Sequence, residues 1–112
     1  MEIGERPWGR YEVILEGSGY KVKKIVFNPG GKLSLQSHEN RSEHWITVFG
    51  VAKVTIGETV QMLDAGKSVY IPLGSKHRLE NETNDRMELI EVQLGRYLGE
   101  DDINRYEDMY GR

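Results

Sequence analysis

The most informative segment of the chain runs from Pro29 to Gly50 and reads PGGKLSLQSHENRSEHWITVFG. Gln36 and His38 are two positions apart in it, so their side chains emerge on the same face if this part is a strand. Glu43 follows at the beginning of the next strand-like run. The segment therefore brings three potential metal donors to the junction of two neighbouring strands.

A second segment, from Gly66 to Asn81, reads GKSVYIPLGSKHRLEN and contributes His77 from a distant turn. Donors from such separate places can converge only inside a closed sheet. One amide oxygen, two imidazoles and one carboxylate suit Zn²⁺ or a similar divalent ion, with positions left open for substrate or water. The spacing predicts a metal site made by Gln36, His38, Glu43 and His77.

Each of these residues also has an ordinary structural interpretation. Alone, His38 could be a hydrogen-bonded surface histidine and Gln36 an amide at the edge of the core. Glu43 could be half of an ion pair with Arg41. His44, which follows Glu43 and faces the other way, is predicted to be structural.

Glycine occurs 13 times, between short runs rich in Val, Ile, Thr and Tyr, which is typical of many short strands joined by tight turns. The predicted strands are Tyr11–Leu15, Tyr20–Phe27, Lys32–Gln36, Glu43–Phe49, Val51–Ile56, Val60–Leu63, Ser68–Ile71, His77–Glu80 and Met87–Leu94. So many short strands in one domain, residues 1–112, indicate an all-β sandwich or barrel. One short C-terminal helix is predicted over Glu100–Tyr110, because Ile103, Tyr106 and Tyr110 recur at helical spacing.

Composition restricts the class of partner. Lys and Arg total 15 against 18 Asp and Glu, so the formal net charge is −3 and the basic excess of a nucleic-acid-binding protein is absent. There is no cysteine, which excludes disulfides, thiol catalysis and iron–sulfur ligation. No run approaches the ~20 apolar residues of a membrane span. We therefore expect a cytoplasmic protein with no nucleic-acid or membrane partner.

The two segments resemble the paired motifs of the cupin superfamily. The first motif is matched by Gly30, Gln36, His38, Glu43 and Gly50, with Gln36 in place of the family's first histidine. The second is matched at every position by Gly66, Pro72, Gly74, His77 and Asn81. This resemblance implies the cupin fold, an all-β double-stranded β-helix or jelly-roll barrel.

Shorter motifs, spread over nearly the whole chain, look like the cupin domain of type II mannose-6-phosphate isomerases. They include Arg6-Pro7-Trp8-Gly9, Tyr20-Lys21-Val22-Lys23, Arg41-Ser42-Glu43-His44-Trp45, Glu91-Val92-Gln93 and Gly99-Glu100-Asp101-Asp102-Ile103. In that family the domain is commonly fused behind a mannose-1-phosphate guanylyltransferase domain, in GDP-mannose biosynthesis. The Gln-x-His pair also resembles the zinc ligands of type I phosphomannose isomerases. Glu39 and Asn40 stand where the type II family has a histidine-rich run.

The resemblance implies a metal-dependent isomerase that interconverts mannose 6-phosphate and fructose 6-phosphate through an enediol. Zn is the expected metal, with Co, Mn, Ni or Fe as alternatives. Such a reaction needs an acid/base group. Strand alternation puts Glu91 and Gln93 on the same face as Leu89, so either this face is an exposed polar one or both side chains enter the interior. In the second case Glu91 is the predicted proton carrier, Gln93 contacts substrate, and Lys23 is the rival base.

A phosphate group needs fixed cations, for which Arg41 and Arg105 are the first candidates. A non-catalytic cupin that binds a sugar or sugar phosphate is the main alternative function. A metal-dependent oxygenase is disfavoured, because oxygenase cupins usually present three histidines to iron and this sequence has Gln36 in place of the first one. We also expect a homodimer, in which Tyr11–Leu15 is an edge strand that a partner covers or exchanges.

Overall fold

The computed structural model describes residues 2–107, which form strands and turns but no helix. The strands are β1 (Ile3–Arg6), β2 (Gly9–Gly17), β3 (Tyr20–Phe27), β4 (Leu35–Ser37), β5 (Arg41–Phe49), β6 (Val51–Ile56), β7 (Thr59–Asp64), β8 (Ser68–Ile71), β9 (His77–Glu80), β10 (Met87–Gly95) and β11 (Asn104–Glu107). Accordingly, residues 2–107 contain no helix of the length and apolarity that crossing a membrane requires. The all-β prediction is confirmed.

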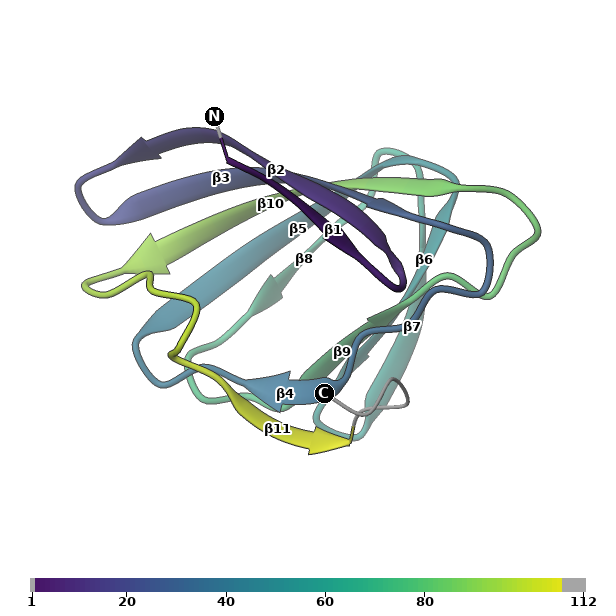
Figure 1. Cartoon of the computed structure of the whole chain (residues 1–112). Helices are drawn as coiled ribbons and strands as arrows, with labels where there is room; N and C mark the ends of the chain where they lie inside the picture. The colour runs from purple at the N-terminus through teal and green to yellow at the C-terminus, as the bar shows by residue number, and fades with distance from the viewer. Residues whose placement is uncertain (1, 108–112) are drawn as a thin grey trace.

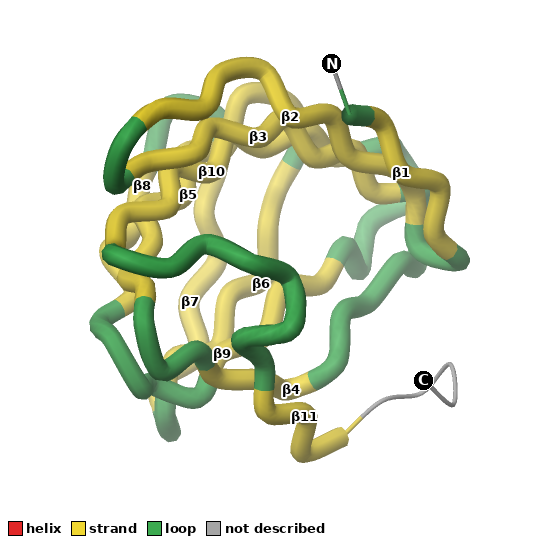
Figure 2. Tube along the Cα trace, turned by 60° about the vertical axis from the view of Figure 1, so that its left-hand side comes forward, coloured by secondary structure: helices red, strands yellow, loops and turns green. Residues whose placement is uncertain are grey.

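The strands form two sheets that face each other (Figure 1). The larger has the order β1-β2-β3-β10-β5-β8, and the smaller has the order β11-β4-β9-β6-β7. Figure 2 shows both sheets curving around a common interior. Neighbouring strands are antiparallel throughout. Along each strand, successive side chains alternate between that interior and the outer surface.

The interior is divided into an apolar end and a polar end. On β3 and β10, Phe27 lies opposite Met87 and Ile25 opposite Leu89, and these four side chains belong to the buried apolar core. Further along the same two strands, Lys23 lies opposite Glu91 and Lys21 opposite Gln93, again buried. Because the strands are antiparallel, the polar residues of separate strands gather at the same end of the barrel.

The structure explains why the first motif has a glycine at position 50. Gly50 forms the turn between β5 and β6 with a φ of 83°, a left-handed conformation that favours glycine. A Cβ atom there would lie 2.8 Å from the carbonyl oxygen of Arg86. Any side chain would thus both strain the turn and collide with the backbone that leads into β10.

The predicted C-terminal helix is wrong for the part that the structure describes. Residues 104–107 form β11, which pairs with β4, with Asn104 opposite Ser37 and Arg105 opposite Gln36. Helical spacing over one or two turns carries little information, whereas the edge of β4 supplies backbone hydrogen-bond partners. Positions 108–110 of the predicted helix lie outside the described residues.

Two other strand predictions need correction. Tyr11–Leu15 belongs to β2 and is not an edge strand, because Ile3–Arg6 pairs with residues 9–12 of β2, so the edge on this side of the larger sheet is β1. The predicted strand Lys32–Gln36 is shorter, since β4 begins at Leu35 and Lys32 makes only an isolated bridge to Glu80. β1 was not predicted from the sequence, because Ile3–Arg6 contains few apolar residues and is followed directly by Pro7.

Candidate functional site

Three of the predicted ligands meet at the polar end of the barrel. His38 follows β4, Glu43 lies on β5 and His77 begins β9. One potential ligand atom from each lies within 4.8 Å of the others, and all three residues are buried. The turn that contains Gly74 helps to align the two motifs, since its N–H donates to the carbonyl oxygen of His38 over 2.9 Å.

Hydrogen bonds fix the orientation of both imidazoles. Nδ1 of His38 lies 2.6 Å from the carbonyl oxygen of Asp102, and Nδ1 of His77 lies 3.0 Å from that of Ser75. A carbonyl oxygen only accepts, so each Nδ1 is the protonated donor and each Nε2 carries the lone pair. Backbone carbonyls hold metal-binding histidines in this way.

Both histidines are also in the charge state that metal binding needs. Burial lowers the pKa of His38 to about 4, assisted by the nearby Arg41 guanidinium. Burial likewise lowers the pKa of His77. Neutral imidazoles whose Nε2 atoms carry the lone pair, next to a carboxylate, fit a divalent ion such as Zn²⁺.

Gln36 lies on the wall of the same cavity as His38 and directly opposite His77 in the pairing of β4 with β9. Its side-chain nitrogen is 3.3 Å from the carbonyl oxygen of Ser34, to which it donates. The amide oxygen is therefore the atom of Gln36 that can serve as a ligand. The structure thus brings all four predicted ligands to one region.

Arg41 lies against two of these ligand residues. Its Nε donates to Glu43 over 2.7 Å, and its Nη2 is 3.1 Å from Nε2 of His38. The ion pair between Arg41 and Glu43, which was the ordinary interpretation of Glu43, is therefore present. Arg41 would have to withdraw from His38 and Glu43 for both to coordinate an ion.

Glu91 enters the interior, as the second interpretation of its strand requires. The Trp45 indole N–H donates to Glu43 over 2.8 Å and to Glu91 over 3.0 Å, which ties the two carboxylates together. Burial raises the pKa of Glu91 to about 7, and the negative charge of Glu43 adds to the effect. Glu91 is thus suited to exchange a proton near neutral pH.

Gln93 and Lys23 flank Glu91 but make different contacts. Gln93 is completely buried, and its amide nitrogen donates to the other oxygen of Glu91 over 2.7 Å. This contact positions the Glu91 carboxylate. Lys23 is paired with Glu91 on the neighbouring strand β3. Its ammonium group, however, donates to Glu100 over 2.8 Å and lies over the ring of Tyr11.

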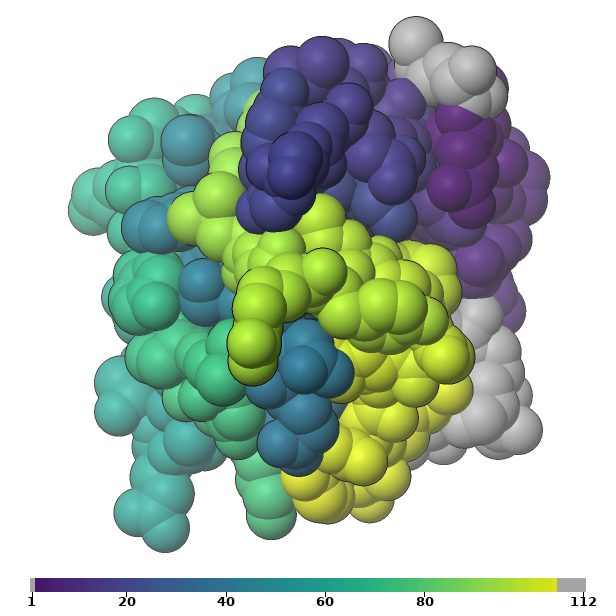
Figure 3. All heavy atoms as spheres, turned by 90° about the vertical axis from the view of Figure 1, so that its left-hand side faces the viewer, coloured from purple at the N-terminus to yellow at the C-terminus, as the bar shows by residue number. Residues whose placement is uncertain are grey.

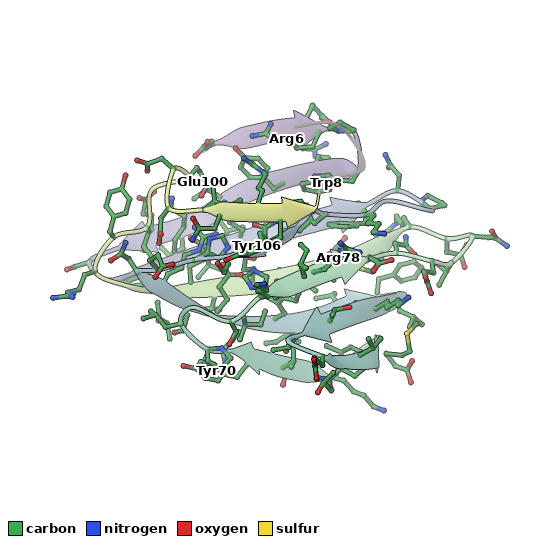
Figure 4. All side chains as sticks on the ribbon, turned by 90° about the horizontal axis from the view of Figure 1, so that it is seen from below. Arg6, Trp8, Tyr70, Arg78, Glu100 and Tyr106 are labelled. Atoms are coloured by element: carbon green, nitrogen blue, oxygen red, sulfur yellow. The ribbon has the colours of Figure 1, made fainter. Side chains whose placement is uncertain are left out.

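A cavity of about 150 Å³ opens beside these groups. Its wall carries several cations, namely Arg6, Lys23, Arg41 and Arg105. Arg105 reaches it from β11 and not from a helix. Arg6 was not among the predicted phosphate ligands, although it begins the Arg6-Pro7-Trp8-Gly9 motif. Figure 4 shows Arg6, at the end of β1, and Trp8, in the turn between β1 and β2, with Tyr70 at the far side of the molecule.

The residues that replace the histidine-rich run lie outside the cluster. Glu39 and Asn40 are exposed, and their backbone N–H groups donate to the Asp102 carboxylate over 3.0 and 2.9 Å. They therefore fix a loop and do not approach as ligands. His44 faces outward, as predicted, and its ring packs against that of Tyr70.

Comparison with solved structures agrees with the fold of the chain. Among solved structures, the fold is similar to KdgF from Halomonas sp., with a TM-score of 0.79 and 15% identity over 87% of this chain and 90% of that one. It is also similar to an RmlC-like cupin from Shewanella frigidimarina, with a TM-score of 0.78 and 23% identity over 89% and 86% of the two chains. The cupin prediction is confirmed.

Curated relatives are more similar in sequence. Xanthan biosynthesis protein XanB from Xanthomonas campestris pv. campestris is 57% identical over 107 residues, 96% of this chain and 23% of XanB. Alginate biosynthesis protein AlgA from Pseudomonas putida is 53% identical, and mannose-1-phosphate guanylyltransferase ManC from Salmonella typhimurium is 51% identical, each over 96% of this chain and 22% of the relative. The chain thus spans under a quarter of the length of these relatives.

The sequence profile of one family covers almost all of the chain. It is described as mannose-6-phosphate isomerase C-terminal, and it matches residues 2–108. The matched range includes both motifs, the Glu91 strand and the segment that carries Arg105. The chain belongs to the family of mannose-6-phosphate isomerase C-terminal cupin domains.

Proposed function

We propose that this chain is a metal-dependent aldose–ketose isomerase that interconverts mannose 6-phosphate and fructose 6-phosphate. One observation carries the proposal. The carboxylate of Glu91 is buried and has a pKa of about 7. It shares the indole N–H of Trp45 with Glu43, which belongs to the candidate metal site. Family membership supports the choice of substrate.

Gln36, His38, Glu43 and His77 would hold the ion. A bound divalent ion supplies a Lewis acid that stabilises negative charge on the oxygens of a sugar substrate. The nitrogen and oxygen donors favour Zn, with Co, Mn, Ni or Fe as alternatives.

Glu91 performs the proton transfer. Its carboxylate removes the proton from C2 of the open-chain aldose, the electron pair of that bond becomes the C1–C2 double bond, and the π pair of the C1 carbonyl moves to O1. The hydroxyl proton of O2 passes to O1, and Glu91 delivers a proton to C1, either the original one or one exchanged with solvent, which gives the ketose. Trp45 and Gln93 hold the two oxygens of Glu91 during both steps, which reduces the reorganisation that the transfer requires.

Arg41 and Arg105 are the proposed phosphate ligands. Both line the cavity, from β5 and β11 on its two sides. A guanidinium group can make paired, charge-assisted hydrogen bonds to phosphate oxygens.

A non-catalytic cupin that binds a sugar phosphate is the second candidate. It is favoured by the position of Arg41, whose guanidinium contacts two of the residues that would coordinate an ion. In that case the cavity and its cations remain, but no proton is transferred. An oxygenase stays disfavoured, because oxygenase cupins usually present three histidines to iron and Gln36 stands in place of the first one.

A coupled assay on protein from which metal has been removed tests the proposal. Each divalent ion is restored separately, and conversion of mannose 6-phosphate to fructose 6-phosphate is followed. We expect at least one ion to restore turnover, and Glu91→Gln to lower this turnover at least about a hundredfold. Binding of the sugar phosphate without turnover with any ion would favour the binding module.

A further inference from the structure

Residues 96–103, here called the strap, connect β10 to β11 and cross the face of the molecule next to the cavity. Figure 3 shows them as a yellow-green to yellow band between the purple-blue N-terminal strands and the blue residues around 40. Lys21 donates to the carbonyl oxygen of Leu98 over 3.2 Å. This hydrogen bond holds the strap against the beginning of β3, at the polar end of the barrel.

Glu100, in the middle of the strap, is bound by two cations from different strands. One carboxylate oxygen lies 2.8 Å from Nζ of Lys23, and the other lies 3.5 Å from Nη1 of Arg41. The Lys23 and Arg41 side chains are only 7% and 8% exposed, whereas the Glu100 side chain is 52% exposed. Two buried cations therefore converge on an anion that reaches them from the solvent side.

Lys23 and Arg41 hold Glu100 by charge. The two cations lower the pKa of Glu100 despite its partial burial, so the carboxylate is ionised at neutral pH. Buried cations are costly without a compensating anion, which means that Glu100 cannot simply leave. It can be exchanged for another anion that offers at least as much charge and as many acceptor oxygens. Phosphate does both.

The strap is built so that Glu100 can move without disturbing His38. Asp102, which supplies the carbonyl for His38, has its own anchor, because its carboxylate accepts from the N–H groups of Glu39 and Asn40. Gly99 precedes Glu100 and gives the backbone rotational freedom at that point. Release of Glu100 thus requires only a local change in the strap.

We propose that Lys23 and Arg41 form an anion site for a phosphate monoester, and that Glu100 is an internal anion that occupies this site until phosphate displaces it. The nature of the ligand rests on the proposed function, but the exchange itself does not require isomerisation. Lys23 is then a phosphate ligand and not a rival base. Release of Glu100 also frees one hydrogen-bond donor of Arg41.

Calorimetric titration of the full chain with inorganic phosphate tests the exchange. Glu100→Gln removes the internal competitor, so phosphate should bind at least about tenfold more tightly, which corresponds to a site that Glu100 fills about nine-tenths of the time. Asp101→Asn is the matched control. It removes the same charge from the neighbouring position, where the carboxylate contacts Tyr97. It should bind phosphate like the wild type.

An equal gain in both variants, or no gain in Glu100→Gln, would overturn the proposal. In the double variant Lys23→Gln, Glu100→Gln the gain should disappear, and its persistence would place the phosphate elsewhere. The wild type provides a measurement that does not depend on variant folding. Saturating phosphate should speed hydrogen exchange at residues 98–101, and unchanged exchange would contradict displacement. These results stand whether or not the protein isomerises mannose 6-phosphate.

Discussion

Gln36 and His77 lie directly opposite each other on β4 and β9, although 40 residues separate them in the chain. The pairing joins the two motifs into one site, because each strand delivers its donor to the same end of the barrel. His38, next along the chain from β4, completes the histidine pair, with ring centroids 5.0 Å apart. The site therefore depends on the sheet and not on a local loop.

Replacing His77 should remove the metal. His77→Ala deletes one imidazole ligand, and we expect the content of divalent metal in purified, dialysed protein to fall severalfold by elemental analysis. His44→Ala is the control, because His44 faces outward and packs on Tyr70. If His77→Ala keeps the stoichiometry of the wild type, the metal is bound somewhere else.

Replacing Glu91 should impair chemistry more than binding. Glu91→Gln keeps the shape and one acceptor but cannot carry the proton, so kcat should fall by about 10²–10⁴-fold with little change in KM. Steady-state kinetics with the restored metal measures this. Glu88→Gln is the control on the same strand, because Glu88 faces outward and pairs with Arg86 and Lys24. Equal kcat values for Glu91→Gln and Glu88→Gln would exclude Glu91 as the proton carrier.

The two arginines should act on substrate affinity. A charge-assisted hydrogen bond contributes about 1.5–3 kcal/mol, so Arg41→Ala and Arg105→Ala should each raise KM for mannose 6-phosphate about tenfold or more. Arg86→Ala, an exposed cation paired with Glu88, should not. Metal content must be measured for Arg41→Ala, because Arg41 contacts His38 and Glu43. A normal KM in both cavity variants would remove them from the phosphate site.

We predict a homodimer, for which the outer face of the larger sheet offers a surface besides the edge of that sheet. The outer face of the larger sheet exposes apolar side chains on three neighbouring strands, namely Ile46, Val48, Tyr70 and Leu94. Burial of such a face by a second copy would stabilise a dimer. Sedimentation should give twice the chain mass at micromolar concentration, and Ile46→Lys should shift it toward monomer. A wild-type monomer would contradict the dimer.

The sequence predicted which residues meet at the polar end of the barrel better than it predicted their surroundings. The spacing of Gln36 and His38 sets a shared face, and alternation on β10 put Glu91 beside Leu89, because both patterns follow from strand geometry alone. The strap could not be predicted. Its course depends on contacts such as that between Lys23 and Glu100, which are 77 residues apart. The position of Arg6 at the cavity could not be predicted for the same reason, because β1 reaches the cavity through its pairing with β2.

The C-terminal segment shows the limit of periodicity. Ile103 and Tyr106 fit helical spacing, but the backbone of residues 104–107 pairs with β4, whose edge would otherwise lack hydrogen-bond partners. The presence of an unpaired strand edge next to a segment is a property of the folded sheet, and it leaves no pattern in the sequence of the segment itself. Arg105 nevertheless reaches the cavity wall, because β11 lies next to the strand that carries Gln36.

Exchange of solvent deuterium into the sugar tests the isomerase assignment most directly. The metal-restored protein is incubated with mannose 6-phosphate in deuterium oxide, and label at C1 and C2 is followed by nuclear magnetic resonance. An enediol whose proton is held by Glu91 should take up deuterium from solvent during turnover in the wild type, and Glu91→Gln should slow this exchange at least about a hundredfold. The absence of both exchange and turnover with every restored ion would contradict the assignment and leave sugar-phosphate binding as the function of the cavity.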